Sequence, residues 1–275
     1  MKSAWQISFS KENSVSDFAF EDKKTLDLLS IHSAILSNSN LKVPIAYRNF
    51  FLFKKAIRAP FIQRVNFPLD FPLDASILDV LQNSFRKGIF QSNIPIQGYH
   101  KLQEEVKPNF ILHLNSAYES IFNNFKSDPR RVLRIIDKEK KFELKDIDFH
   151  TFDLFANQNI NLQIPKSYRA ISSFRILIED TLENHKGLLK GVYFEESLVA
   201  VCFFKWVGDR LQFLLPVVNA LGKKNYATSF LLHTIWQEYA KTNTVFDFSG
   251  STMPSIAKFM KDFSPETEYY YSYSW

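Results

Sequence analysis

Cysteine, glycine and long apolar runs are all scarce in this sequence. Its single cysteine, Cys202, lies inside an apolar run, so no internal disulfide can form and a reducing compartment is favoured. We expect Cys202 to be a buried core thiol rather than a nucleophile. No uninterrupted apolar stretch approaches the roughly 18 residues of a membrane-spanning helix, and the first residues lack the apolar segment of a signal peptide. The sequence therefore predicts a cytoplasmic protein with no membrane span.

The seven glycines form no nucleotide-binding loop. Neither G-x-G-x-x-G nor G-x-x-x-x-G-K-[ST] occurs, which disfavours Rossmann and P-loop proteins. The G-x-S-x-G turn of many hydrolases is missing too. The six histidines never stand at H-x-x-x-H spacing and one cysteine cannot complete a zinc site, so we expect no metal. His233 is expected to be packed or exposed, and a role as a base is the alternative.

A large excess of one charge is also absent. The formal charge of +5 comes from 34 basic and 29 acidic residues. The two signs are interspersed, so composition alone does not indicate nucleic acid. The densest basic stretch, Lys126–Lys141, contains Arg130, Arg131 and Arg134. An exposed helix face is its simplest interpretation, and an RNA-binding surface is the alternative.

Aromatic side chains are what the sequence has in quantity, with 28 Phe and 11 Tyr among 275 residues. Aromatic packing should therefore dominate the core. The length suits one large domain or two of about 130 residues each. The aromatic content alone does not indicate a lipid ligand, because a core of this size would use most of these side chains.

Secondary structure is most legible in the second half of the chain. Apolar spacings of three and four predict a helix over Ser167–Asn184. Three β-like runs with short links then predict an antiparallel meander, and a loop over Asn219–Asn225 leads into another helix. The elements expected after the first helix are strands Leu188–Phe194, Leu198–Lys205 and Leu211–Val218, helix Tyr226–Lys241, strand Thr244–Phe248, a helix starting at Ser251–Pro254 and strand Glu268–Trp275. The first half predicts strands at Ala4–Phe9, Leu41–Tyr47 and Phe110–Leu114 and a helix at Ala75–Lys87.

The order of these elements, with a three-stranded meander followed by alternating helices and strands, is the layout of the GNAT acyltransferase core, a mixed α/β fold. Chemistry in that layout needs a backbone amide freed on the third meander strand and a helix N-terminus that receives a pyrophosphate. Pro216 cannot donate to a strand ladder, so Pro216, Val217 and Val218 mark either a functional bulge or an ordinary strand end.

The loop that follows stands where coenzyme A enzymes usually show Gln/Arg-x-x-Gly-x-Gly/Ala. It reads Gly222, Lys223, Lys224, Asn225, Tyr226 and Ala227. Ala227 fits the pattern, whereas Asn225 replaces the central glycine. The two lysines are candidates to pair with donor phosphates, and plain solvation is the alternative.

A family resemblance is carried by Val245–Ser251, which reads V-F-D-F-S-G-S, followed by Ile256–Phe263, which reads I-A-K-F-M-K-D-F. These stretches resemble the "D-F-x-G-S … F-K-x-x-F-G" signature of Fem-like (FemAB/FemX-type) aminoacyl transferases and their bacterial GNAT-like relatives. Ser127–Arg134 is similar to the arginine-rich helix of that family, and Gly187–Gln237 to its meander and the helix beyond. The matches lie within Asn123–Phe263, a little over half of the chain.

The resemblance implies two tandem GNAT-like halves, a diverged N-terminal domain over residues 1–120 and a C-terminal domain over residues 121–275. It also implies an acyl group moving from an acyl-CoA thioester or aminoacyl-tRNA donor to a small-molecule or peptide amine by direct attack, with no tightly bound cofactor.

Several residues take candidate roles from this resemblance. Asp247 is the first candidate to hold or deprotonate the attacking ammonium, and bonding to the backbone amides of the following turn is the alternative. The candidates for binding an anionic substrate are Arg130, Arg131, Arg134, Ser249 and Ser251.

Three classes of function remain open on these grounds. The first is an acyl or aminoacyl transferase. The second is a catalytically inactive relative that binds a ligand or partner, which is favoured by Asn225 and Ser264 standing where glycines are expected. The third is an RNA-binding module. No long heptad hairpin for gripping tRNA is visible, so tRNA is the less supported donor, and the oligomeric state is not predicted.

Overall fold

The chain forms two structural units. The computed structural model describes residues 5–9, 15–98, 103–159, 171–249 and 254–275. The first unit comprises residues 1–108 with 269–275, and the second comprises residues 109–268. The chain enters the second unit within strand β6, Gln103–His113, and leaves it within β12, Glu266–Ser274. The domains predicted from sequence differ from these units in where residues 109–120 and the last strand fall.

The second unit is built on a mixed sheet, whose strands follow in space as the end of β6, β11, β10, β9, β8 and β7. Strands β8 to β10 form the expected antiparallel meander, β7 adds a fourth antiparallel strand beside β8, and β11 runs parallel to β10. The strands are β7 Phe142–Asp146, β8 Gly187–Phe194, β9 Ser197–Val207, β10 Arg210–Val218 and β11 Val245–Asp247. The helices are α3 Tyr118–Asn124, α4 Ser127–Glu139, α5 Phe149–Asn159, α6 Arg175–Glu183, α7 Ala220–Lys224, α8 Ala227–Tyr239 and α9 Pro254–Lys261, with a 3-10 turn at Ile171–Phe174.

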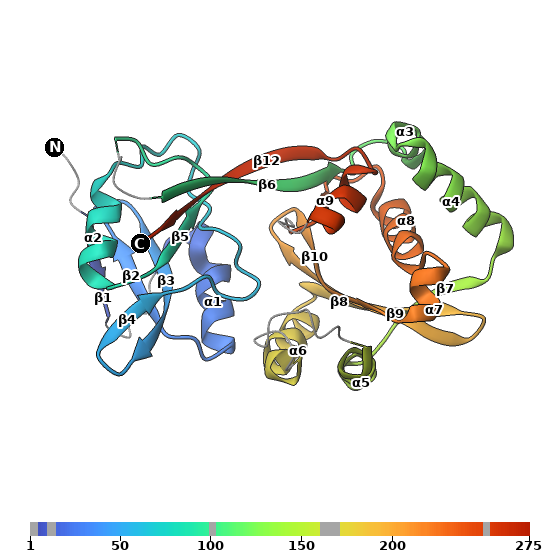
Figure 1. Cartoon of the computed structure of the whole chain (residues 1–275), viewed down its shortest axis with the longest axis horizontal. Helices are drawn as coiled ribbons and strands as arrows, with labels where there is room; N and C mark the ends of the chain where they lie inside the picture. The colour runs from blue at the N-terminus through green and yellow to red at the C-terminus, as the bar shows by residue number, and fades with distance from the viewer. Residues whose placement is uncertain (1–4, 10–14, 99–102, 160–170, 250–253) are drawn as a thin grey trace. The chain divides into compact units, whose positions relative to one another are not determined.

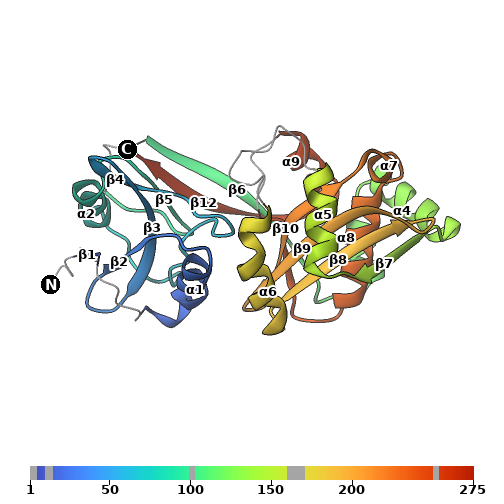
Figure 2. The same ribbon diagram turned by 90° about the horizontal axis from the view of Figure 1, so that it is seen from below.

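Helices cover both faces of this sheet (Figures 1 and 2). Helices α4 and α8 lie on one face, and α5 and α6 lie on the other. Residues Val199–Phe204 of β9 are therefore all buried, which explains why this strand reads as a continuous apolar run. Trp236 of α8 lies at the centre of the core, and its ring meets four other rings edge-on, those of Phe125, Phe246, Phe248 and Phe263. Across the described part of the chain, no helix has the length and apolar character needed to cross a membrane.

Strands β10 and β11 pair over three residues and then part. Gln212 of β10 lies beside Asp247, the last residue of β11, and β10 continues to Val218. Past that point the register of β10 against β9 shifts between Leu214 and Val217. Leu215 has a left-handed backbone, with φ of 46°. Of the two structural interpretations of Pro216, the structure contains the bulge, and the function of the bulge stays a prediction.

The first unit repeats the order of the second. Three antiparallel strands are followed by a helix and a further strand, and just before this last strand Lys87 forms an isolated parallel bridge with Lys55 of the third strand. These elements are β2 Ser33–Ser37, β3 Lys42–Phe50, β4 Phe53–Ala56, α2 Ser76–Ser84 and β5 Ile89–Ser92, preceded by β1 Gln6–Ser8, a 3-10 turn at Asp17–Ala19 and α1 Phe20–Leu28. Alternate residues of β3 explain the two layers, because Ile45 packs in the cluster with α2 whereas Ala46 packs with Leu26 of α1. The chain thus consists of two tandem GNAT-like halves.

Most predicted elements are confirmed, with one correction. The segment Asn219–Asn225, expected to be a loop, contains helix α7, because the Asn219 side chain caps the Gly222 amide at 2.8 Å. Helices α1, α3 and α5 and the short strands β2, β4, β5 and β7 were not foreseen. The predicted start of α9 at Ser251–Met253 and the beginning of the helix at Ser167–Ala170 lie outside the described residues.

Helix α7 packs against β9 through a glycine, which yields a test. A methyl group added at Gly222 would lie 2.5 Å from the Val199 carbonyl oxygen and 2.8 Å from a methyl group of Val218. We expect Gly222→Ala to destabilise the protein by about 1–3 kcal/mol through overpacking, and each kcal/mol should lower the melting temperature by roughly 2–4 °C. The control is Lys223→Ala, an exposed change in the same helix. Equal melting temperatures for the two variants would show that α7 does not pack in this way.

Candidate functional site

The candidate active site of the second unit lies where β10 and β11 part. Asp247 ends β11 beside Gln212, and the bulge at Leu215 begins three residues farther along β10, about 10 Å at the rise of a strand. The bulge, Val217 and Val218 lead directly into α7. The structure therefore brings Asp247 and the predicted donor-binding residues of β10 into one region.

Asp247 is enclosed, and both of its carboxylate oxygens have partners. Its side chain is 5% exposed. The Oδ1 atom accepts a hydrogen bond of 2.6 Å from the Ser249 amide, and Oδ2 lies 3.3 Å from Nη1 of Arg210. A general base needs access to the substrate ammonium, so this arrangement favours the alternative role for Asp247, that of ordering the turn after β11. The Ser249 hydroxyl is buried and meets no partner among the described residues.

Arg210 connects this carboxylate to a network across the sheet. Its guanidinium bonds both oxygens of Glu268 on β12, at 2.9 and 2.5 Å, and Asn109 of β6 donates to the same carboxylate at 3.5 Å. The hydrogen bonds that Arg210 donates to Glu268, helped by the charge of Asp247, raise the pKa of Arg210 above its ordinary value. The guanidinium therefore stays charged wherever the protein is folded. Sequence reasoning missed this network because no local pattern relates its members.

The bulge has a specific partner on the neighbouring strand. Cys202 is the residue of β9 that faces Leu215 and Pro216, because Leu214 pairs with Phe203 and Val217 pairs with Val201. Its thiol is fully buried and donates to the Leu214 carbonyl at 3.2 Å. Burial raises the pKa of this thiol well above its ordinary value. Cys202 is confirmed as a core thiol.

The predicted donor loop uses its own amides within α7. The Gly222 amide donates to the Asn219 side chain, and the amides of Lys223, Asn225 and Tyr226 donate to preceding carbonyls at 3.0–3.3 Å. The lysine side chains are exposed, and Ala227 is buried in the core. The backbone amides that are left to bind an anion in this region are therefore the first amides of α8, which have no acceptor within the helix.

Helix α4, which carries the three candidate arginines, packs against α8. Phe125, just before α4, meets Trp236 late in α8, whereas Phe142, just after α4, stacks on Phe230 early in α8. The two helices therefore run in opposite directions. The beginning of α4, with Arg130 and Arg131, lies beside the end of α8 and away from the start of α8, and Arg134 is in the middle of α4.

The arginines themselves differ in environment. Arg131 is exposed, and the exposed Arg134 lies over the ring of Phe122 at 5.6 Å. The Nε atom of Arg130 is enclosed without a partner among the described residues. The structure does not bring this trio to the start of α8. Ser251, the remaining candidate for anion binding, lies outside the described residues.

A Tyr–His–Asp chain joins three helices, with His233 buried at its centre and Asp137 exposed at one end, and sequence reasoning did not foresee it. The Tyr118 hydroxyl of α3 bonds Nδ1 of His233 on α8, and Nε2 of the same ring bonds Asp137 of α4 at 2.9 Å. In the neutral imidazole tautomer that donates from Nε2 to the Asp137 carboxylate, Nδ1 accepts from Tyr118. Burial, together with the charge of Asp137, raises the pKa of Tyr118 and keeps its hydroxyl protonated. His233 is confirmed as a packed residue, and the chain holds α8 in place.

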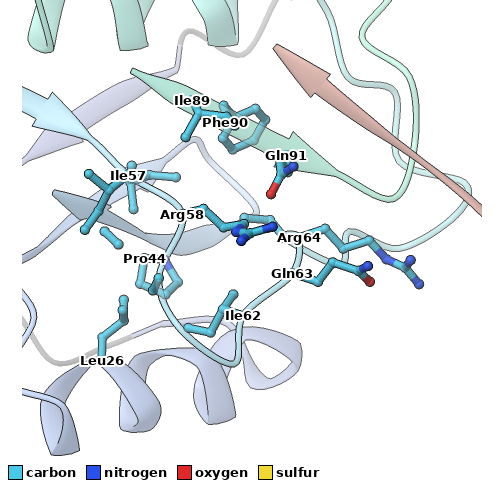
Figure 3. Close-up of a pocket in the computed structure, with 14 residues that line it drawn as sticks. Leu26, Pro44, Ile57, Arg58, Ile62, Gln63, Arg64, Ile89, Phe90 and Gln91 are labelled. Atoms are coloured by element: carbon cyan, nitrogen blue, oxygen red, sulfur yellow. The ribbon is translucent and has the colours of Figure 1, made fainter. Parts of the chain in front are cut away.

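The first unit has a hollow at the corresponding place, between the end of β4 and β5 (Figure 3). Its volume is about 410 Å³ with the open mouth included, and most of its lining is apolar. Arg58 and Gln91 point toward one another across it. Gln91 donates to Ser272 at 3.3 Å, and its amide oxygen is sealed without a partner among the described residues. The exposed Arg58 guanidinium over this apolar lining is suited to a small carboxylate, and no motif in the sequence indicated it.

Comparisons with known proteins show the fold. No protein-family model matches the chain, and no curated protein sequence matches it. The crystal structure of FemX is similar with a TM-score of 0.60 at 9% identity, covering 90% of this chain and 89% of that one. A conserved protein of unknown function from Bacteroides thetaiotaomicron is similar with a TM-score of 0.57 at 8% identity, covering 97% and 93%. L-PGS from Bacillus licheniformis follows with a TM-score of 0.53 at 12% identity, covering 90% and 86%. The expected resemblance to Fem-like, GNAT-type proteins is confirmed for the fold.

The position of Asp247 leads to a prediction about stability. Asp247→Asn removes the buried charge beside Arg210 and one of its two acceptor oxygens. We expect it to destabilise the protein by about 1–3 kcal/mol, seen as a lower melting temperature. The control is Asp146→Asn, whose side chain is 80% exposed, and which should change stability by less than about 0.5 kcal/mol. A general base without a structural role would instead leave the melting temperature of Asp247→Asn unchanged.

Proposed function

We propose that this protein is an acyl or aminoacyl transferase of the GNAT or Fem type, acting on an amine. The observation that carries the proposal is the parting of β10 and β11, with the bulge at Leu215–Pro216 beside it. Beyond Gln212, the edge of β10 that faces β11 has no partner strand among the described residues. Amides on that edge are available to hold a carbonyl oxygen. The similarity in fold to FemX over most of both chains supports the proposal.

The reaction proposed is a direct transfer. The amine nitrogen attacks the acyl carbonyl carbon, and the carbon–sulfur bond of a thioester, or the carbon–oxygen bond of an aminoacyl ester, breaks. The leaving thiol or hydroxyl takes the proton that the amine loses. Freed amides of β10 stabilise the oxyanion of the tetrahedral intermediate, and positioning supplies the rest. Asp247 contributes by ordering the turn through the Ser249 amide rather than by touching the proton.

The phosphates of the donor would bind at the start of α8. The first amides of this helix lack intrahelical acceptors and the helix dipole favours an anion there. Lys223 and Lys224, both exposed, precede this end directly. Tyr226, which leads into the helix, has a left-handed backbone and is 52% exposed. Both coenzyme A and the end of a tRNA carry phosphates that would meet these groups.

A second candidate function is binding without catalysis. The amides of residues 222–226 are bonded within α7, and the Asn225 side chain adds a bond of 2.9 Å to the Leu221 carbonyl. A pyrophosphate could use these amides only if α7 unwound. This observation favours a chain that has kept the fold and lost the coenzyme A loop.

The deciding experiment is a thermal-shift titration with acetyl-CoA, longer acyl-CoAs and a non-hydrolysable aminoacyl-tRNA analogue. A donor at about a hundred times its dissociation constant should add about 2.7 kcal/mol of stability, or roughly 5–10 °C in the melting temperature. We expect one donor class to give this shift and to support acyl transfer to an amine. No shift with any donor, or binding without transfer to any of a panel of amines, would favour the second candidate.

The lysines before α8 yield a further prediction. Lys223→Ala combined with Lys224→Ala should weaken binding of the donor that gives the shift by about fivefold, since exposed ion pairs contribute a few tenths of a kcal/mol each. The salt dependence of binding should become shallower as well. The matched control is Lys241→Ala with Lys258→Ala, which removes the same charge elsewhere. If the control weakens binding equally, net charge rather than this site governs the affinity.

A further inference from the structure

Strands β3 and β4 of the first unit form a hairpin (Figure 1), and the side chains of its two-residue turn, the tip of the hairpin, are apolar and exposed. Its turn consists of Phe51 and Leu52, whose exposed fractions are 101% and 80%, and the adjoining Phe50 is 49% exposed. Two-residue hairpin turns favour Gly, Asn and Asp, because these residues adopt the required backbone easily. Neither the turn nor the core therefore accounts for a phenylalanine and a leucine at this tip.

The hairpin below the tip is well held. Phe50 and Phe53 are paired across the strands, with their rings stacked at 5.2 Å. The Arg86 guanidinium lies over the ring of Phe53 at 5.6 Å, and Lys54 lies over Phe9 at 4.4 Å. These contacts stabilise the two strands next to the exposed turn.

On the hairpin face that carries Phe50 and Phe53, the next pair of side chains away from the turn is basic. Arg48 lies directly opposite Lys55, two residues back from Phe50 and Phe53. Side chains two residues apart share a face, so this face carries two like charges, then two rings, then the tip. Like charges directly opposite one another are unfavourable unless an anion lies between or beside them.

The surroundings of the hairpin are basic as well. Between Asp27 and Asp70 the sequence contains no acidic residue, and none occurs between Asp79 and Glu104. Lys87, which follows Arg86, lies beside Lys55 on the neighbouring strand. No carboxylate forms an ion pair with Arg48, Lys55, Arg86 or Lys87 within the described residues. The surface around the tip therefore suits an anionic partner.

We propose that this hairpin docks the protein on a membrane surface that contains anionic lipids. Phe51 and Leu52 enter the boundary of the acyl chains, and Arg48, Lys55 and Arg86 meet the lipid phosphates. The cations lie two residues behind the rings, about 7 Å at the rise of a strand, and the headgroup layer on each side of a bilayer is roughly 5–7 Å thick. A bilayer fits better than RNA, because a leucine at the tip offers no stacking face for a base. The proposal does not depend on the transferase function.

Cosedimentation of the full chain with lipid vesicles tests this proposal. We expect binding to vesicles of phosphatidylcholine mixed with phosphatidylglycerol, and little binding to phosphatidylcholine alone. Phe51→Ser with Leu52→Ser should weaken binding at least about tenfold, because each large apolar side chain loses its transfer out of water. Arg48→Gln with Lys55→Gln should weaken it about tenfold or more and make the salt dependence shallower.

The matched control is Phe20→Ser with Leu69→Ser. It removes the same two kinds of side chain from the same unit, where they are 57% and 84% exposed outside the hairpin. Equal binding by the control and the tip variant, or no binding of the wild type to mixed vesicles, would overturn the proposal. Melting temperatures of all variants should match the wild type, because every changed side chain is largely exposed.

A direct readout uses the buried state of Cys202. Because this is the only cysteine and it is fully buried, Phe51→Cys places the one reactive thiol at the tip. An environment-sensitive dye attached there should shift its emission to the blue on mixed vesicles, whereas the same dye on Leu69→Cys should not. Loss of RNA-oligomer binding, or of a dimer in sedimentation velocity, in the tip variant without any dye shift would instead assign the hairpin to RNA or to a second copy of the chain.

Discussion

The structure of the second unit depends on a charge network at the point where its sheet opens. Strands β10 and β11 share only three paired residues, so backbone bonds alone join them weakly there. Arg210 reinforces this point by bonding Asp247 on β11 and, in bidentate geometry, Glu268 on β12. Enclosing these charges costs desolvation energy. Removing one member would leave the others unmatched, so the network specifies how the strands meet.

The rest of the candidate site follows from that junction. Beyond its pairing with β11, β10 has a free edge and the bulge opposite Cys202, and these are the parts of the strand that a carbonyl group could contact. The strand then leads through Asn219 into α7, which packs so closely on β9 that only a glycine fits at position 222. The start of α8 is thus placed by packing. The Tyr118–His233–Asp137 chain adds a second constraint on the same helix.

The two units use one backbone plan for different surfaces. In the second unit, the parting of the third strand from its parallel neighbour is bordered by a bulge and a helix start. In the first unit the corresponding place is an apolar hollow with Arg58 at its opening. The first unit also carries the exposed tip at Phe51 and Leu52, between strands that elsewhere contribute to a core. The two units therefore share the order of strands and helices, whereas the residues at their strand edges and turns differ.

The sequence by itself determined the meander, helix α8, most of the later strands and the aromatic nature of the core. Those features depend on apolar periodicity and composition, which are local properties of the chain. It also indicated that Cys202 would be a core thiol and that Pro216 marks either a bulge or the end of a strand. It could not choose between a bulge and a strand end, because that choice depends on the register of β9.

Only the tertiary structure decided which side chains meet. Arg210 and Glu268 are 58 residues apart, and Tyr118 and His233 are 115 apart, so no spacing rule relates them. The same reason explains why the sequence could not show the contact of Asp247 with Arg210, which begins another strand 37 residues earlier. The cap that turned an expected loop into α7 was local, but its packing against Val199 was not. Contacts between distant segments are set by how sheets and helices stack, and one-dimensional patterns do not contain that information.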